Sequence, residues 1–138
     1  MTTVITFGTF DLFHIGHLNI LERAAKYGDK LVVGVSSDEL NFAKKQRLPI
    51  YSCKERMRII GSLKCVDEVF CEESLADKAL YCERYSASLM IIGDDWKNKK
   101  NSTGKTFDEQ LEGVCKVEYL ERTPSISTTQ LIEKISSV

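Results

Sequence analysis

Short apolar runs alternate along the chain with amphipathic or polar segments. These runs are rich in β-branched and large aliphatic residues, and their length is typical of buried strands. They are Val4–Phe7, Leu31–Val35, Val66–Phe70, Leu89–Ile92 and Val114–Leu120. Strands that are apolar throughout, without alternating polar positions, indicate a parallel sheet that is covered on both faces.

The segments between these strands carry helix signals. Apolar residues in Leu18–Ala25 follow a helical spacing, and Gly28 is well placed to end that helix. Ser52 followed by Glu55 forms a capping box, which predicts a helix running to about Leu63.

Two further helices and one loop complete the pattern. Leu75–Tyr85 is predicted to be helical, and Ser127 with Gln130 forms a second capping box that opens a helix through about Ile135. Asn41–Ile50 has no clear periodicity and contains a proline, so it is predicted to be a loop.

Alternating strands and helices predict a doubly wound, Rossmann-like α/β domain over residues 1–138. Its five-stranded, mainly parallel sheet should have helices on both faces. Ligands of such sheets bind beyond the carboxyl ends of the strands. Gly8–Asp11, Ser36–Asp38 and Gly93–Trp96 each follow a predicted strand directly, so we expect them to share one edge of the sheet.

Composition narrows the possible partners. The formal net charge of −1 gives no basis for binding nucleic acid or membranes through bulk electrostatics, so any anion affinity must come from a local site. The start of the chain lacks signal-peptide features, and no apolar run approaches the ~20 residues that span a bilayer. We therefore expect a cytoplasmic protein. The five cysteines include no C-x-x-C pair and are interpreted as scattered thiols.

The two histidines of the chain, His14 and His17, stand three residues apart where the first helix should begin. This spacing places both imidazoles on one helix face, and Gly16 between them leaves room for a ligand to approach the backbone. The free N–H groups of a helix N-terminus form an anion site. The pair therefore predicts a polyphosphate site, and the alternative is two unrelated histidines at a helix start.

Two separated motifs resemble those of a known family. The segment GTFDLFHIGH, Gly8–His17, resembles the nucleotide-binding signature of the cytidylyltransferase family in the H-x-G-H nucleotidyltransferase superfamily, and Ile126–Thr129 matches its I-S-T-T hallmark. Arg122–Thr129 is similar to the R-T-x-x-I-S-T-T segment of glycerol-3-phosphate cytidylyltransferases. Gly93–Trp96 and Val66–Val69 resemble further elements of that subfamily.

The resemblance implies transfer of a cytidylyl group from CTP, with Mg²⁺, to a small phosphorylated alcohol. Glycerol 3-phosphate would give CDP-glycerol, for a cell-envelope or capsular polymer, and pyrophosphate. Phosphocholine, phosphoethanolamine or another polyol phosphate are alternative acceptors. An adenylyltransferase is a further alternative, and a non-catalytic nucleotide-binding protein belongs to a different class.

The resemblance and the predicted positions assign roles to individual residues. The expected catalytic residues are His14, His17, Lys44 and Arg122. The expected nucleotide-binding residues are Gly8, Thr9, Phe10, His14, His17, Asp94, Arg122, Thr123, Ile126, Ser127, Thr128 and Thr129. The expected acceptor-binding residues are Asp11, Lys44, Lys45, Lys64, Asp95 and Trp96. No protein-bound metal site is assigned.

Each assignment has a structural alternative. The hydroxyls of Ser127–Thr129 suit an ordinary N-cap, and basic residues in a loop usually form a solvated face. One of Asp94 and Asp95 is expected to face the acceptor, the cytidine or a nucleotide-bound Mg²⁺, and the alternative is a turn cap. Trp96 could line the acceptor pocket or cover the sheet edge. Asp11 is better suited to fixing the Gly8–His14 loop through backbone bonds than to contacting substrate.

The chain departs from the subfamily at three places. Lys64 stands where the glycerol-3-phosphate enzymes carry an arginine. Lysine keeps the positive charge but lacks the bidentate donor geometry of the guanidinium group. The basic loop 97–105 is longer than usual, and the loop around Arg47–Ile50 is one residue longer. Because of these differences, the resemblance does not determine which phosphorylated alcohol is the acceptor. The resemblance also implies a homodimer with Val66–Val69 near its interface.

Overall fold

The computed structural model describes residues 1–124 and 126–138, and its centre is a five-stranded sheet. The strands are β1 (Thr3–Gly8), β2 (Lys30–Ser36), β3 (Glu68–Glu72), β4 (Leu89–Gly93) and β5 (Lys116–Leu120). Their order is β3-β2-β1-β4-β5, and every neighbouring pair is parallel. The predicted doubly wound α/β class is therefore confirmed.

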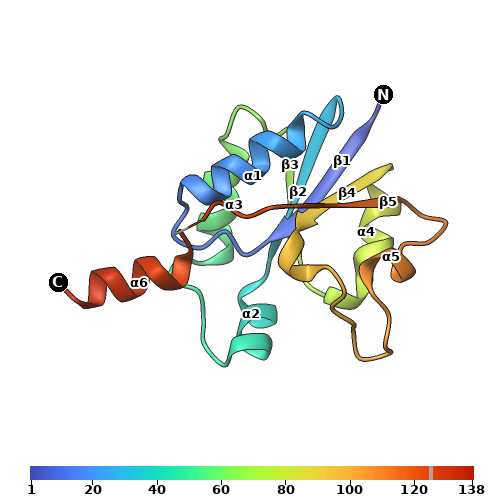
Figure 1. The fold of residues 1–138 in the computed structure, drawn as a ribbon. Coiled ribbons are helices and arrows are strands. Elements are labelled where there is room, and N and C mark those ends of the chain that lie inside the picture. Colours follow the sequence, from blue (N-terminus) through green and yellow to red (C-terminus); the bar gives the residue numbers. More distant parts are fainter. Residues whose placement is uncertain (125) are drawn as a thin grey trace.

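Helices cover both faces of this sheet, and each face has its own apolar core (Figure 1). The α-helices are α1 (Ile15–Ala25), α2 (Asp38–Lys45), α3 (Cys53–Gly61), α4 (Lys78–Arg84), α5 (Phe107–Gln110) and α6 (Thr128–Ser136). Short 3₁₀ turns, η1 (Leu75–Asp77) and η2 (Asp94–Trp96), follow β3 and β4. Helices α1 and α3 pack on one face, α4 and α5 on the other, and α6 extends away from the body of the molecule.

The chain reverses its direction of winding between β1 and β4, which places a topological switch point at the centre of the sheet. Along the carboxyl edge the strands end at Glu72, Ser36, Gly8, Gly93 and Leu120. The expectation that the segments following β1, β2 and β4 share this edge is therefore confirmed.

The third strand begins two residues later than its apolar run predicts. Val66 lies in a turn, where its N–H donates to the carbonyl of Leu63, and its side chain is buried in the core. Asp67 caps the neighbouring strand by accepting from the N–H of Leu31 at 2.8 Å. The shift matters because it makes Glu72 the last residue of β3, at the carboxyl edge.

The prediction of a loop over Asn41–Ile50 is wrong in its first half, where the chain forms α2. This helix has no apolar stripe because its buried residue is Asn41, which is 1% exposed. The amide of Asn41 donates to Ser36 Oγ and to the carbonyl of Ser37, both at 2.8 Å, and accepts from Thr9 Oγ1 at 2.9 Å. Hydrogen bonds, rather than apolar contacts, therefore hold α2 to the sheet.

Some helix ends also differ from their predictions. Helix α1 ends before Gly28, whose missing side chain instead admits the carbonyl of Thr2, because a Cβ there would lie 2.6 Å from that oxygen. At α6, Ser127 accepts from the N–H of Gln130, which is one half of the predicted capping box. Within the described residues no helix is long and apolar enough to cross a membrane.

Candidate active site

A cavity of about 400 Å³ lies at the carboxyl edge of the sheet, within the range of ~300–1,000 Å³ that is usual for small-molecule sites. Its first wall is formed by the β1–α1 loop and the start of α6. Its second wall is formed by α2, the β3–α4 segment, and the residues that follow β4 and β5. Most of the sequence-predicted site residues line it: Gly8, Thr9, Phe10, Asp11, His14, His17, Lys44, Lys45, Asp95, Trp96, Arg122, Thr123, Ile126, Ser127, Thr128 and Thr129.

The β1–α1 loop has a strained backbone. Phe10 and Leu12 have φ angles of 54° and 48°, in the left-handed region that non-glycine residues seldom adopt. The buried ring of Phe10 folds back over Gly8, where a Cβ would lie 2.8 Å from two ring carbons. The same ring packs edge-on against His17 at 5.4 Å. Gly8 and Phe10 therefore shape the floor beneath the histidines, and such strain is typical of functional loops.

The histidines form the N-terminal cap of α1. His14 Nδ1 accepts from the N–H of Gly16 at 3.0 Å, and His17 Nδ1 accepts from the N–H of His14 at 3.3 Å. The two rings are stacked with centroids 3.7 Å apart. Because each Nδ1 is an acceptor, each neutral ring carries its proton on Nε2. Both imidazoles therefore offer an Nε2–H donor at the start of the helix.

The electrostatic surroundings keep these rings neutral. Burial, followed by the charges of His14 and Arg122, lowers the pKa of His17 to about 3. Burial and Arg122 also lower the pKa of His14. His14 Nε2 is buried and has no hydrogen-bond partner among the described residues. A buried donor without a partner is costly, so this atom points to a ligand acceptor.

The start of α6 is docked on α1 by contacts between distant parts of the sequence. Asn19 Nδ2 donates to Thr123 Oγ1 at 3.0 Å, and Thr128 Oγ1 donates to the carbonyl of Asp11 at 2.7 Å. Gly16 permits this approach, because a Cβ on it would lie 3.1 Å from Ile126 Cγ2. Two helix N-termini, both favourable for anions, thus face one cavity.

These contacts separate the roles of the ISTT residues. Ser127 is the N-cap, as its structural alternative predicts, and Thr128 uses its hydroxyl proton to hold the β1–α1 loop. Within the described part of the chain, the backbone N–H groups of Thr128 and Thr129 donate to no protein acceptor. The segment therefore offers chiefly backbone N–H groups to an anion. Ser125, which directly precedes this segment, lies outside the described residues.

Asp11 is 6% exposed, and its carboxylate binds backbone. Oδ2 accepts from the N–H of Ile50 at 2.7 Å, and Oδ1 accepts from the N–H of Tyr51 at 2.9 Å. The interpretation of Asp11 as the residue that fixes its loop therefore agrees with the geometry better than direct contact with an acceptor.

Lys44 and Lys45 reach the cavity because α2 is a helix. They stand three and four residues after Asn41, on the same helix face as this buried anchor. Desolvation lowers the pKa of Lys44, and the carboxylate of Glu72 opposes that shift. Lys44 lines the cavity, although the residue as a whole is exposed.

Arg122 lies over Gly93 and pairs with Asp95, with Nε 3.0 Å from Oδ1. This pair is exposed, so the guanidinium keeps donors for a ligand. Trp96 both lines the cavity and packs on Phe107 at 5.6 Å. Asp94 and Lys64 are exposed and absent from the lining. Lys64 precedes β3 and so lies near the amino edge of the sheet, away from the cavity.

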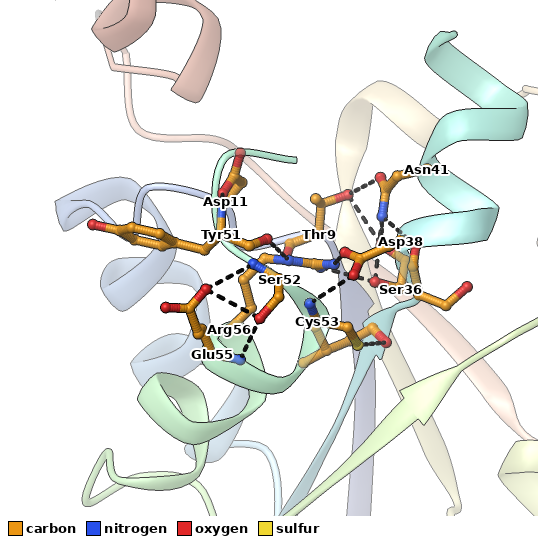
Figure 2. A network of polar contacts seen from close by, with 12 residues as sticks. Thr9, Asp11, Ser36, Asp38, Asn41, Tyr51, Ser52, Cys53, Glu55 and Arg56 are labelled. Atoms are coloured by element: carbon orange, nitrogen blue, oxygen red, sulfur yellow. Dashed lines mark hydrogen bonds and ion pairs between the residues drawn. The ribbon is translucent and has the colours of Figure 1, made fainter. Parts of the chain in front are cut away.

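Sequence reasoning missed Arg56, a fully buried arginine on α3 (Figure 2). Its guanidinium donates to the carbonyls of Tyr51, Thr9 and Ser36 at 2.8–3.0 Å and pairs with Asp38 at 2.7 Å. It therefore ties the loops after β1 and β2 to α3. Helix α3 also carries the exposed Arg58, and nothing in the sequence distinguishes the two arginines.

Sequence reasoning also missed a buried ion pair in the second wall. Lys78 Nζ is bound to Glu72 Oε2, both residues are 2% exposed, and both line the cavity. Desolvation lowers the pKa of Lys78, and Glu72 opposes this shift. Neither residue belongs to a motif, so only their meeting in space identifies them.

The described residues contain no group of three or more His, Cys, Asp or Glu side chains placed to hold a metal ion. Of the carboxylates at the cavity, those of Asp11 bind backbone and that of Glu72 binds Lys78. Mg²⁺ is commonly held by one or two carboxylates together with substrate phosphates. This donor set fits a Mg²⁺ ion that is carried by a nucleotide, with Asp95, whose Oδ1 accepts from Arg122, as the exposed carboxylate beside it.

The chain is similar in sequence to known proteins. The family model described as Cytidylyltransferase-like matches residues 5–134. The glycerol-3-phosphate cytidylyltransferase of Bacillus spizizenii is 42% identical over the full length of both chains. The enzyme of the same name from Staphylococcus aureus is 36% identical over 98% of this chain and 96% of its own.

The fold has relatives among solved structures. A lipopolysaccharide core biosynthesis protein from Thermoplasma volcanium superposes with a TM-score of 0.73 at 24% identity, over 89% of this chain and 98% of its own. That likeness concerns the fold alone. The family match and the whole-length identities show that the chain belongs to the cytidylyltransferase-like family.

Proposed function

We propose that this protein transfers the cytidylyl group of CTP to glycerol 3-phosphate, giving CDP-glycerol and pyrophosphate. One observation carries the proposal: an H-x-G-H helix start and an I-S-T-T helix start face one cavity in a chain 42% identical, over its full length, to an enzyme of that name. The CDP-glycerol would serve a cell-envelope or capsular polymer.

In this proposal the first wall binds the triphosphate. The anionic phosphate oxygens can accept hydrogen bonds from the Nε2–H donors of His14 and His17. They can also accept from the first-turn N–H groups of α1 and α6. Lys44 and Arg122, from the second wall, supply the formal positive charge. Because these donors are held by caps and by packing, they need no reorganisation as charge builds on the α-phosphate.

The reaction itself needs little covalent help. A phosphate oxygen of the acceptor forms a bond to the α-phosphorus, the bond from that phosphorus to the β-bridging oxygen breaks, and pyrophosphate leaves with the electron pair. The acceptor phosphate is already an anionic nucleophile, so neither histidine has to remove a proton. Positioning and electrostatic stabilisation account for the catalysis.

A Mg²⁺ ion bound to CTP would neutralise charge on the phosphate oxygens and on the leaving pyrophosphate. In the protein, Asp95 could orient the bound nucleotide, and its pairing with Arg122 keeps both side chains beside the cavity. Replacing Mg²⁺ with EDTA should abolish turnover.

A pyrophosphate-release assay tests the proposal. The protein, CTP, Mg²⁺ and glycerol 3-phosphate should release pyrophosphate and form CDP-glycerol, detected by mass spectrometry. Parallel reactions with ATP, phosphocholine and phosphoethanolamine distinguish the alternative donors and acceptors. If no acceptor supports turnover with either nucleotide, the proposal and the enzyme class both fail.

We also propose a cytoplasmic homodimer with the β3 edge of the sheet in its interface. This edge of the sheet has no neighbouring strand within the described residues, and an unpaired edge can pair with another chain. The side chains of Val66 and Val69 pack inward against the core, so contact would involve the strand edge itself and Glu68. Light scattering after size-exclusion chromatography measures the molar mass and so tests whether the protein is a dimer. A monomeric mass contradicts the proposed dimer.

A further inference from the structure

Cys53 and Cys71 lie side by side, although 18 positions separate them in the sequence. Cys53 is the first residue of α3, and Cys71 lies in β3. Their sulfur atoms are 3.5 Å apart. The sequence shows no C-x-x-C pair, so only the fold brings these two thiols together.

The arrangement suits a disulfide bond. An S–S bond is about 2.0 Å long, so the two sulfur atoms would have to approach by roughly 1.5 Å. Side-chain rotation and a small movement of the first turn of α3 cover such a distance. The contact with Cys53 places the Cys71 sulfur beneath α3, on the face of the sheet rather than at its free edge. Both residues are half-buried, so a small reagent can reach them.

The two thiols differ in reactivity. Burial, followed by the hydrogen bond with Cys53, raises the pKa of Cys71 to about 12. Cys71 therefore keeps its proton at neutral pH and donates it toward Cys53 Sγ. The thiolate is the nucleophilic form of cysteine, so Cys53 is the residue that attacks first and Cys71 is the residue that resolves.

The other cysteines lack these features. Cys82 is hydrogen-bonded to Cys115 on the opposite face of the sheet, but Cys82 is fully buried and out of reach of a reagent. Cys65 is half-buried and has no sulfur partner at hydrogen-bonding distance among the described residues. Accessibility and a neighbouring sulfur therefore coincide at Cys53 and Cys71.

The pair is connected to the supports of the cavity. The N–H of Cys53 donates to Asp38 Oδ2 at 3.2 Å, and Oδ1 of the same carboxylate accepts from Arg56 at 2.7 Å (Figure 2). Arg56 in turn holds the loops that follow β1 and β2. Cys71 directly precedes Glu72, which lines the second wall. Drawing the two sulfur atoms together therefore pulls on both of these elements.

We propose that Cys53 and Cys71 form a redox-sensitive modification site, which a low-molecular-weight disulfide converts into a disulfide bond between α3 and β3. The Cys53 thiolate attacks one sulfur of the reagent, whose S–S bond breaks, and one thiolate leaves. Cys71 then loses its proton and attacks the Cys53 sulfur of the mixed disulfide, which displaces the second thiolate. The two cysteines are oxidised, the reagent is reduced to two thiols that take up the two protons, and excess thiol reverses the exchange.

The disulfide should also act on the neighbouring cavity. A misplacement of about 1 Å in groups that position a substrate can cost on the order of 10²-fold in rate. We therefore expect kcat/KM for CTP to fall about 10- to 100-fold on oxidation and to recover with dithiothreitol. The bond itself forms whether or not the proposed activity is correct.

The test treats the folded protein with oxidised glutathione. The remaining thiols are then alkylated after denaturation and counted by mass spectrometry. We expect three of the five cysteines to be alkylated, and peptide mapping should join the peptide of Cys53 to that of Cys71. Dithiothreitol should restore all five thiols. Pyrophosphate release is measured on the same samples.

Two variants separate this site from general oxidation. Cys71→Ser removes the resolving thiol, so Cys53 should retain glutathione as a mixed disulfide and no internal bond should form. Cys65→Ser is the matched control, because Cys65 is equally half-buried but has no sulfur neighbour among the described residues. This control should form the disulfide as the wild type does.

Each outcome decides the inference. It is overturned if the treated wild type keeps all five thiols, or if mapping joins any other two cysteines. If the bond forms and turnover is unchanged, its action on the cavity is overturned while the proposed function stands. If the reduced protein turns over no acceptor, the proposed function fails, and the thiol count alone decides whether the site exists.

Discussion

Arg56 provides a test of how the loops of the site are held in place. Its guanidinium is fully buried and joins three backbone carbonyls, from Thr9, Ser36 and Tyr51, to the carboxylate of Asp38 (Figure 2). The change Arg56→Lys keeps the positive charge and removes the planar fork. In Arg56 the four partners are bound by three separate nitrogen atoms of the guanidinium group, and the single nitrogen of a lysine cannot reach all of them.

The magnitude follows from the bonds that are lost. If the lysine keeps Asp38 and one carbonyl, two buried carbonyls lose their donor, and each costs about 1–3 kcal/mol. We therefore expect the free energy of unfolding to fall by roughly 2–6 kcal/mol, a large share of the ~5–15 kcal/mol typical of a domain. Loosening the loops that carry Thr9 and Ser36 should also raise KM for CTP.

Urea unfolding followed by circular dichroism measures this loss. Arg58→Lys is the control, because Arg58 lies two residues along the same helix and is exposed. It should change the free energy of unfolding by no more than about 0.5 kcal/mol. If Arg56→Lys falls within that same margin, the guanidinium bonds do not hold the site together and the reasoning is refuted.

Three other predictions concern the first wall. His14→Ala or His17→Ala should each lower kcat about 10²- to 10³-fold, as expected for the loss of a preorganised donor to the transition state; unchanged pyrophosphate release in both variants contradicts the proposed role. The folded-state pKa of His17, about 3, lies below its unfolded value of 6.5. Between these values the unfolded chain binds more protons, so this group makes stability rise with pH by up to about 1.4 kcal/mol per unit. His17→Asn should remove that slope in denaturation curves from pH 4 to 7, and an identical slope contradicts the assignment. Gly16→Ala should raise KM for CTP and destabilise the fold by about 1–3 kcal/mol, because its Cβ would lie 2.8 Å from His14 Cε1 and 3.1 Å from Ile126. Thermal unfolding and CTP titration check this, and wild-type values for both would refute it.

The sequence by itself determined the strands, most helices and the first wall of the site. Buried parallel strands are recognisable because they are apolar throughout, and helix starts because their caps are local. The rule that parallel strands end at one edge then predicts that the segments after β1, β2 and β4 converge. His14, His17 and Ile126–Thr129 could be identified from the sequence because each stands at a helix start and within a motif that resembles those of a known family.

Tertiary structure alone decided the buried polar contacts that support the site and the Glu72–Lys78 pair of the second wall. Helix α2 is held by the buried amide of Asn41, and Arg56 binds carbonyls far away in the sequence. Glu72 and Lys78 become a pair only when β3 and α4 meet at the cavity. Buried polar groups need partners that long-range folding supplies, and such partners leave no periodic pattern in the sequence. These buried polar contacts therefore depend on the whole fold, because distant polar groups satisfy one another.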